Sequence, residues 1–592
     1  MPPPHRPGAR ASRPDQPQNP APTEQIGKIK TSVTKTAQGG PVQIKQTLTA
    51  RGALAALVVI AAAGLAACSS PATSTNTLLK PGTPTDTLIN VAAIEPERSL
   101  IPADSSYSSG ATFTPLLFSG LSYLNPDGTI ANELATAVVP NPDCTEYDIQ
   151  IRSGEVFSDG TKLKSDNFIQ AWNDAAKASN RRLKAGLFAP IEGFSDTANQ
   201  NLTGLQRLSD THFKVYLTQP TCDFPMRLTD PAFVPLPDSA FDSAGNVTSG
   251  FGENPYGYGP YMLAREGAWE HGIQLTLVPN TRYHGPRQAQ NAGLTFKFYH
   301  DPDQAYEDLT RGALDIDETL PDRAKDSFTE QLGKRTRAVS SAHVKFLAIP
   351  SSGHFTLGTE EGRLRRAAVS QAIDRDDIVK RFFNGTREVA TDFVTPTIAG
   401  HTTKLPGNEV LTYQPDIARS LWERANQISP WTDGDTFTIA RPDNGLNTWI
   451  DAALSSIGET LGIHTAGEPY LDQRAIDLAV TRHDIDAAFL VDCQSPYPGM
   501  HSYLQPCFAT DGYANSIGYS APDFDAVLNQ ARGVSDDAAA NREYQRAEEI
   551  LLRDLPVLPL WHAKSLIGWS AKIADVVPNW RGSVQYWKVS AN

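Results

Sequence analysis

Apolar and polar residues alternate along several short segments of the chain, as expected for half-buried β-strands. The alternation predicts strands over residues 86–92, 147–151, 213–217, 275–278 and 294–298. Apolar residues recur at helical spacing behind capping residues elsewhere. That spacing predicts helices over 168–178, from 301 or 303 to 312, over 364–373 and over 536–554. Because strands and helices are interspersed, the pattern predicts an α/β fold with sheets covered by helices.

The N-terminal part has a different pattern. An uncharged apolar run over residues 53–63 follows Lys45 and Arg51 and ends in Leu-Ala-Ala before Cys68, which predicts a secretory signal. The 16 residues from 52 to 67 are too few for a membrane span, which needs about 20. This ending resembles the bacterial lipobox, which implies cleavage before Cys68 and a lipid on its sulfur. A signal peptide without a lipid is the alternative.

The charge of the chain changes at the same place. Residues 1–67, the expected leader and lipoprotein signal peptide, hold 8 Lys+Arg and 2 Asp+Glu, a net charge of +6. Subtracting +6 from the total of −14 leaves −20 for the remainder, which argues against a nucleic-acid partner. Residues 68–84 are expected to form a flexible tether. The lipid at Cys68 would hold the protein on the outer side of the cell membrane.

Four further cysteines, Cys144, Cys222, Cys493 and Cys507, are disulfide candidates because an even number in an exported chain suggests two bridges. Their order favours Cys144–Cys222 and Cys493–Cys507, although three connectivities are possible. We find no Cys-x-x-Cys and no His-x-x-x-His pair, so the sequence predicts no structural zinc site and no cofactor. The roughly 525 residues after the signal are too many for one core and predict two or three domains.

Six groups of motifs occur in order along the chain. They are 118–121 with 124–130 and 134–135; 151–161 with 166–168 and Trp172; 254–261 with Asn280 and Tyr283; 312–316; 364–368 with 372–375; and 519–525 with 555–560. Together they resemble the extracellular solute-binding proteins of family 5, the oligopeptide- and dipeptide-binding lipoproteins of ABC importers, in an actinobacterial-type form. The motifs themselves are expected to be structural. Arg363, Arg365 and Arg366 are expected on the outward face of their helix, with Arg365, Arg366 and Asp374 tying it to its neighbours.

The resemblance implies a periplasmic-binding-protein-like type II fold, in which two lobes joined by a hinge close on ligand and an extra domain is inserted. Lobe I would comprise residues 85–118, 230–344 and 559–592, the extra domain 119–229, and lobe II 345–558. The chain would cross between the lobes near 343–351 and 555–560. Ligand bound between the lobes would stabilise the closed state.

The resemblance also implies that a peptide lies extended between the lobes. The family's amine-binding carboxylate falls on Pro496 and its tryptophan on Cys493, so both usual residues are missing. Asp492 is the candidate substitute for the carboxylate, and Arg482 is a candidate for the peptide carboxylate. The other ligand-binding candidates are Ser106, Ser108, Gln494, Tyr497, Asn515 and Trp561. An alternative for Asp492 is the surface end of a strand, and one for Arg482 is a solvated loop.

The implied function is peptide capture by a monomeric lipoprotein that delivers its ligand to ABC permease subunits and their ATPases. An enzyme is disfavoured because we find no Gly-x-Ser-x-Gly, His-Glu-x-x-His or phosphate-binding loop motif. Two alternatives share the fold: a non-peptide solute as the ligand, and a sensory or adhesive protein without transport.

Overall fold

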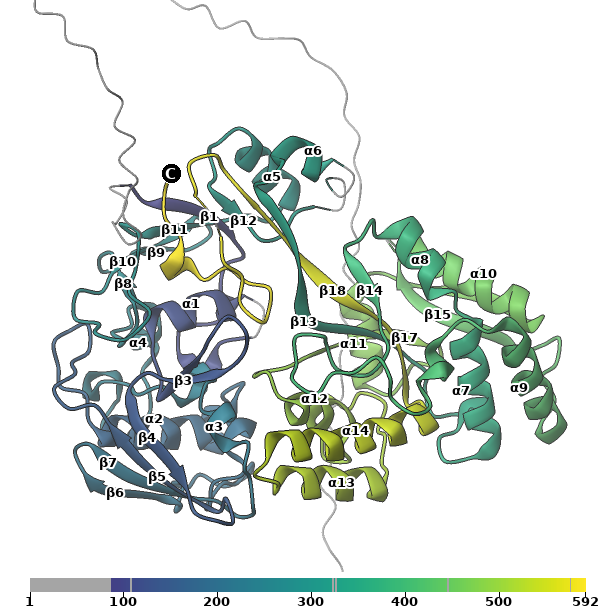
Figure 1. The fold of residues 1–592 in the computed structure, drawn as a ribbon, viewed down its shortest axis with the longest axis horizontal. Helices are drawn as coiled ribbons and strands as arrows, with labels where there is room; N and C mark the ends of the chain where they lie inside the picture. The colour runs from purple at the N-terminus through teal and green to yellow at the C-terminus, as the bar shows by residue number, and fades with distance from the viewer. Residues whose placement is uncertain (1–86, 107–108, 322–323, 325–326, 444–446, 575) are drawn as a thin grey trace, which may run out of the picture. The chain divides into compact units, whose positions relative to one another are not determined.

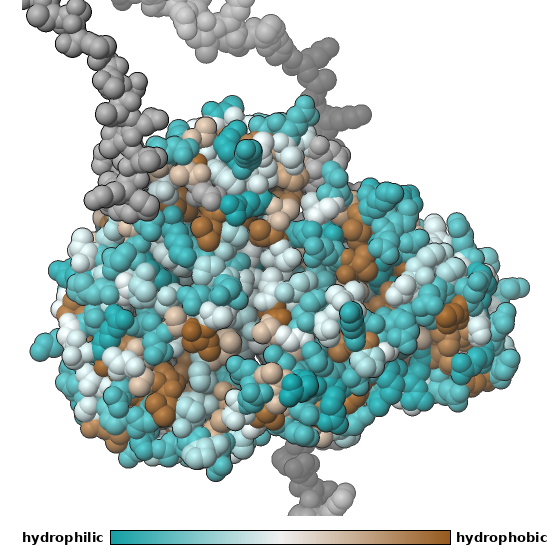
Figure 2. Space-filling model, viewed as in Figure 1, coloured by the Kyte–Doolittle hydropathy of each residue, from teal (hydrophilic) through white to brown (hydrophobic). Residues whose placement is uncertain are grey.

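The computed structural model describes residues 87–592, except 107–108, 322–323, 325–326, 444–446 and 575. The expected leader, tether and lipidation residue Cys68 lie outside the described residues, as does Ser108. No helix within the described part is both long enough and apolar enough to span a membrane. On the face shown in Figure 2 most of the surface is hydrophilic and apolar residues lie in small scattered groups.

Strands and helices alternate along the chain. The strands are β1 (Ile89–Ala93), β2 (Ser122–Leu124), β3 (Ile130–Asn132), β4 (Ala135–Pro140), β5 (Glu146–Ile151), β6 (Leu205–Ser209), β7 (His212–Tyr216), β8 (Tyr261–Leu263), β9 (Trp269–Glu270), β10 (Gln274–Pro279), β11 (Leu294–Phe298), β12 (Ile316–Asp317), β13 (Thr336–Ala348), β14 (Arg387–Val389), β15 (Thr436–Pro442), β16 (His464–Tyr470), β17 (Phe489–Gln494) and β18 (Val557–Trp569).

The helices are α1 (Gly110–Leu117), α2 (Ser165–Ala176), α3 (Phe224–Arg227), α4 (Ser249–Glu253), α5 (Pro302–Thr310), α6 (Phe328–Leu332), α7 (Glu360–Ala372), α8 (Arg375–Phe382), α9 (Pro415–Ile428), α10 (Trp449–Leu461), α11 (Gln473–Thr481), α12 (Met500–Phe508), α13 (Pro522–Arg532) and α14 (Asp537–Asp554). The helices and strands predicted from the sequence are confirmed, with boundaries that shift by a few residues.

Two long strands, β13 and β18, run side by side through the middle of the molecule (Figure 1). They belong to a ten-stranded sheet with the order β17-β13-β18-β12-β1-β11-β10-β8, in which β14 also pairs with β18 and β9 with β10. Their antiparallel pairing is interrupted between Ser340 and Val344, and again between Lys345 and Phe346. Such irregularities bend a strand and redirect its side chains. The interruptions lie next to residues 343–351, where the sequence predicts the first crossing between the lobes.

Buried apolar residues form separate cores on either side of these strands. One core contains buried residues between Ile89 and Ile316 together with Ile567–Val589 near the C-terminus. The other contains residues between Ala342 and Trp561, with Trp580. The four-stranded sheet β4-β5-β7-β6 lies within 119–229, the segment expected to form the extra domain. The exact domain boundaries stay a prediction.

Helix α7 corrects one expectation from the sequence. Arg363 is exposed as predicted, but the outward placement of Arg365 and Arg366 is wrong because both side chains are fully buried. The Arg365 guanidinium lies 4.1 Å from the ring centroid of Trp422 and 5.4 Å from the ring centroid of Trp431. An amphipathic pattern counts arginine as polar, although its flat guanidinium stacks readily on aromatic rings.

Arg366 instead connects both crossing strands to α7. Its guanidinium donates hydrogen bonds to the carbonyls of Ile349 and Pro350, which follow β13, and to those of Leu555 and Pro556, which precede β18. It also donates to Phe355 O at 3.0 and 2.7 Å. Burial lowers the pKa of Arg366 to about 9. Arg366 therefore contributes to the expected tie between this helix and its neighbours by holding both crossing segments.

Both favoured disulfides are confirmed. Cys144 is bonded to Cys222, and Cys493 is bonded to Cys507. The first bridge closes part of the 119–229 segment, while the second joins β17 to α12. The second bridge fixes the loop that contains Pro496 and Tyr497.

Candidate ligand-binding cleft

A cavity of about 250 Å³ lies between the two cores, where β1, α1, β12, β13 and β17 approach the C-terminal segment. Its lining residues are mainly small or polar. They are Ala92, Ala93, Ile94, Ser109, Ala111, Thr112, Glu318, Thr319, Ala342, His343, Gln494, Ser565, Arg581, Gly582, Ser583 and Tyr586. With the boundaries expected from the sequence, Gln494 is the lining residue that belongs to lobe II, and the other lining residues belong to lobe I.

Glu318 is the carboxylate of this cavity. It follows β12, its Oε1 accepts a hydrogen bond from the backbone N–H of Val584, and Tyr586 also hydrogen-bonds to it. Burial raises the pKa of Glu318 to about 7, and the charge of the neighbouring Asp317 adds to the increase. A cationic ligand group would stabilise the ionised form of this carboxylate, because a nearby positive charge favours ionisation.

Arg581 supplies positive charge to the same region. It lines this cavity and an adjacent cavity of about 140 Å³, whose walls include Tyr123, Pro496 and Trp580. Its guanidinium donates to the carbonyl of Pro496 at 2.6 Å and lies 4.8 Å from the centroid of the Trp580 ring. The site therefore places a carboxylate and a guanidinium along one continuous lining.

The third feature of the cleft is a sheet edge. In the order of the strands described in the ten-stranded sheet, β17 is at one end and β8 at the other, and the last residue of β17, Gln494, is paired with His343 of β13. Both side chains line the cavity. Burial lowers the pKa of His343, although the negative charge of Asp492 opposes this effect. A neutral His343 and an amide at Gln494 can hydrogen-bond a ligand without fixing its charge.

Of the residues proposed from the sequence, Gln494 lines the cavity and Asp492 lies two residues away on the same strand face. The Asp492 carboxylate is exposed and paired with Lys345, whose Nζ lies 2.5 Å from Oδ2. This pair reduces the charge that Asp492 could offer to a ligand. Ser106 lies beside the N-terminus of α1, where its Oγ accepts from the Gly110 N–H and lies 3.2 Å from Ser109 Oγ.

Three other candidates hold the protein framework together. Tyr497 is buried and donates its hydroxyl hydrogen to Asp223 Oδ2 at 3.1 Å, which connects its loop to α3. Asn515 accepts from Tyr519 N and donates to the carbonyls of Ala509 and Tyr519, which shapes a turn. Trp561 is buried against aromatic rings of α8 and α10.

Arg482 is exposed at the C-terminal end of α11 and does not line either cavity of the cleft. Ligand contact by these predicted residues stays a prediction. Sequence reasoning missed Glu318, His343 and Arg581. Glu318 lies two residues after the recognised motif 312–316, and the nearby acidic residues Asp315 and Asp317 were the available signal.

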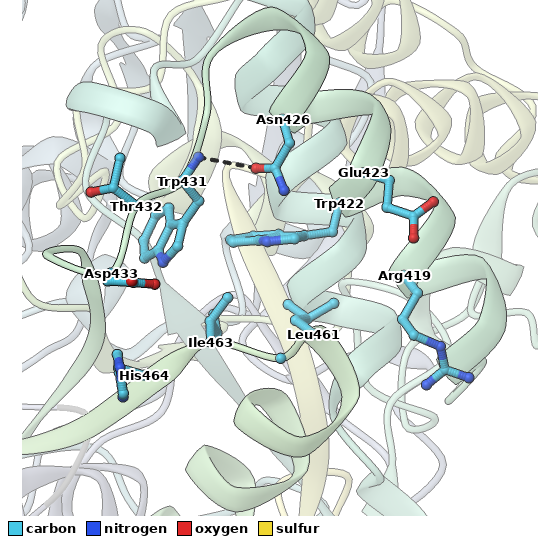
Figure 3. Close-up of a pocket in the computed structure, with 11 residues that line it drawn as sticks. Arg419, Trp422, Glu423, Asn426, Trp431, Thr432, Asp433, Leu461, Ile463 and His464 are labelled. Atoms are coloured by element: carbon cyan, nitrogen blue, oxygen red, sulfur yellow. Dashed lines mark hydrogen bonds between the residues drawn. The ribbon is translucent and has the colours of Figure 1, made fainter.

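Larger cavities lie outside this cleft. One of about 450 Å³ lies on lobe II between α9 and the turn joining α10 to β16, where Trp422 and Trp431 form one wall (Figure 3). Both tryptophans are already stacked with Arg365, which gives them a structural role. Another cavity, of about 440 Å³, is lined by residues 186–227 and by residues of α12 and α13. Neither cavity combines the two crossing strands with a sheet edge.

Comparison with known proteins assigns the family. The model described as bacterial extracellular solute-binding proteins, family 5 middle, matches residues 129–515, more than half of the chain. The chain belongs to this family. Its mixed sheets and helices have the fold of periplasmic binding proteins, with two lobes around a hinge.

Relatives of this solute-binding protein differ in the ligand that their names state. The oligopeptide-binding protein OppA of Bacillus subtilis is 22% identical over 86% of this chain and 94% of its own length. The probable deoxycholate-binding periplasmic protein YgiS of Escherichia coli is 24% identical over 78% of this chain and 86% of its own length. The binding protein DppA of Helicobacter pylori, solved with the peptide STSA, has a TM-score of 0.69 at 18% identity and covers 85% of this chain and 98% of its own.

Proposed function

We propose that this protein is the substrate-binding lipoprotein of an ABC importer and that it captures short extended peptides between its two lobes. The observation that carries the proposal is the cleft itself, which combines Glu318, Arg581 and the edge of β17. A peptide has a cationic amine, an anionic carboxylate and a backbone that can extend a sheet edge. These three properties match the three features of the lining.

Glu318 takes the role left open by Pro496. The Pro496 carbonyl accepts a hydrogen bond from Arg581, which lines both cavities, and Glu318 lines the larger of the two. Ionised Glu318 pairs with the peptide amine, while Arg581 faces the peptide carboxylate. Asp492 is the weaker candidate because Lys345 already neutralises it. The modest cavity volumes favour short peptides.

The proposed role is to bind and deliver the ligand without catalysing a reaction. Closure around the ligand presents a shape that a membrane permease recognises, and the permease with its ATPases moves the peptide inward. The lipid on Cys68 keeps the protein at the outer face of the membrane. The substitution Cys68→Ser is expected to move the protein from the membrane fraction to the soluble fraction. Unchanged membrane association of this variant would contradict the anchor.

The amine site is tested with isothermal titration calorimetry of the mature protein. The ligands are a short peptide that binds the wild type and the same peptide with an acetylated amine. Glu318→Gln is expected to weaken the free-amine peptide about 10- to 100-fold, the cost of losing a charged pair shielded from water. The acetylated peptide is expected to bind wild type and Glu318→Gln with similar affinity. Asp492→Asn is the matched control and should change either affinity less than about threefold.

Two results would contradict this assignment. If Asp492→Asn lost affinity and Glu318→Gln did not, the amine anchor would be Asp492. If no peptide bound the wild type while a steroid acid such as deoxycholate did, the ligand class would be wrong. The name of the E. coli relative makes that second ligand a concrete comparison.

A further inference from the structure

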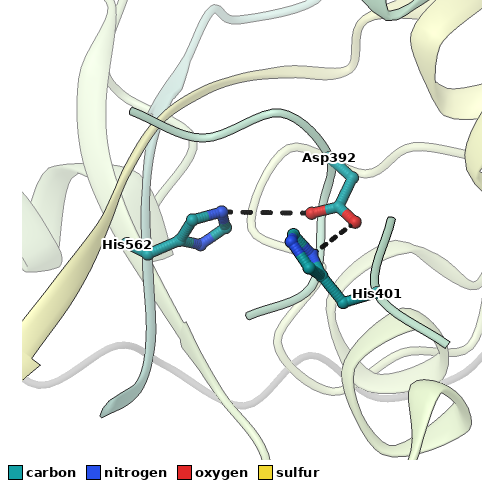
Figure 4. Close-up of side chains that lie close together, drawn as sticks. All are labelled: Asp392, His401 and His562. Carbon is teal, nitrogen blue, oxygen red and sulfur yellow. Dashed lines mark ion pairs between the residues drawn. The ribbon is translucent and has the colours of Figure 1, made fainter. Parts of the chain in front are cut away.

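Three side chains from two segments far apart in the sequence converge in the interior of the protein. Asp392 and His401 belong to the segment after β14, and His562 lies on the crossing strand β18. One atom of each side chain lies within 4.8 Å of the corresponding atoms of the other two. Asp392 is fully buried and His562 is 2% exposed. Figure 4 shows both imidazole rings directed toward the Asp392 carboxylate.

The polar atoms of this cluster lack the hydrogen bonds that burial normally requires. Within the part of the chain that the structure describes, both ring nitrogens of His562, Oδ1 of Asp392 and Nδ1 of His401 have no hydrogen-bond partner. His401 Nδ1 lies 2.7 Å from Asp392 Oδ2, but the two groups do not have the angular geometry of a hydrogen bond. Buried polar groups without partners are rare in native proteins and call for an explanation such as a bound ion.

A second carboxylate faces the cluster from α14. Glu548 is fully buried, its Oε1 accepts from the Phe393 N–H at 3.1 Å, and its Oε2 has no hydrogen-bond partner among the described residues. Two shielded carboxylates beside two imidazoles form an environment that a divalent cation would neutralise.

We propose that Asp392, His401 and His562 bind a zinc-class divalent metal ion, with Glu548 or water completing the coordination. Zinc prefers imidazole nitrogen and carboxylate oxygen in tetrahedral sites with bonds of about 2.0–2.2 Å, which separates ligand atoms by about 3.3 Å. The measured separations bracket this value, at 2.7 Å for His401 Nδ1 to Asp392 Oδ2 and 4.0 Å for His562 Nε2 to Asp392 Oδ1. Small side-chain adjustments would therefore bring these ligand atoms to the separation found in a tetrahedral zinc site.

The His562 imidazole is suited to ligation because it is almost fully buried and neither ring nitrogen has a hydrogen-bond partner among the described residues. The His401 side chain retains 14% exposure, which provides an entry route. No short sequence motif marks this site, because its ligands come from two segments far apart in the chain. Bound metal would fasten β18 to the segment 390–407 of lobe II at the level of Val344, beside the interruption of the β13–β18 pairing.

The test is metal analysis of the purified wild type and three variants, His562→Gln, Asp392→Asn and His401→Gln. Each protein is stripped with a chelator, incubated with Zn²⁺, desalted and analysed for bound metal, and its thermal unfolding is recorded with and without Zn²⁺. The matched control is His354→Gln, which removes a half-buried histidine that is paired with Glu361 at 2.6 Å outside the cluster. Circular dichroism verifies that each variant is folded.

We expect one zinc per wild-type chain and per His354→Gln chain, with a rise in unfolding temperature that Mg²⁺ and Ca²⁺ do not reproduce. Each cluster variant is expected to bind zinc at least about 100-fold more weakly and to lose the rise. Because His401 is the least buried ligand, His401→Gln remains a fair test if the other two variants fail to fold. The proposal is overturned if the wild type retains no zinc, or if folded His401→Gln retains it as tightly as the wild type.

Discussion

Replacing Arg366 with methionine removes the side chain that holds both lobe-crossing segments. The carbonyls of Ile349, Pro350, Phe355, Leu555 and Pro556 would lose their charged donor inside the protein. A buried acceptor without its donor costs about 1–3 kcal/mol. Removing the buried guanidinium also removes its desolvation penalty, which offsets part of this loss. We therefore expect Arg366→Met to lower the free energy of unfolding of lobe II by about 3–5 kcal/mol.

Urea unfolding followed by tryptophan fluorescence measures this loss, because Trp422, Trp431, Trp449 and Trp561 all lie in or beside the lobe II core. The control is Arg363→Met, an exposed arginine on the same helix, for which we expect a change within about 0.5 kcal/mol. If Arg366→Met unfolded within 1 kcal/mol of the wild type, the guanidinium would not anchor the crossing strands. The reasoning from orphaned carbonyls would then be refuted.

Two further predictions concern stability. Replacing Cys144 and Cys222 by serine should lower the free energy of unfolding by about 4 kcal/mol, and replacing Cys493 and Cys507 should lower it by about 3 kcal/mol. The difference is expected because the first pair closes a loop of 78 residues and the second pair a loop of 14. Equal losses in urea unfolding would argue against loop closure as the cause. Glu318 has a folded-state pKa of about 7 against 4.5 for the free side chain, so the folded protein binds the extra proton and its stability falls as the pH rises from about 4.5 to about 7. Glu318→Gln should remove this fall and gain about 1–3 kcal/mol relative to the wild type between pH 5 and pH 8; a pH-independent difference between the two proteins would refute the raised pKa.

Local sequence signals predicted the secondary structure well where one face of an element meets a core. Helix α14 begins behind the capping residue Asp536 and ends before Pro556, and β5 follows the expected alternation of buried and exposed residues. These signals depend on neighbours in the chain, so they can be read without the fold. The ordered motifs supplied the family, and the family model confirms it.

The sequence could not identify the parts of the site that depend on long-range packing. The buried positions of Arg365 and Arg366 require the tryptophans and carbonyls that surround them, which come from other segments. Glu318 enters the cleft because the C-terminal segment folds back over β12 and covers it. Asp392 and His562 meet because β14 pairs with β18. None of these contacts leaves a periodic or short-motif signal.

The central claim, that the cleft binds peptides through Glu318, is tested most directly by identifying what the protein carries. Mature protein is purified without added ligand, and mass spectrometry records the small molecules released on unfolding, for the wild type and for Glu318→Gln. The account predicts short peptides with free amines in the wild type and a marked depletion of them in the variant. Release of a non-peptide solute from both proteins in equal amounts would contradict it.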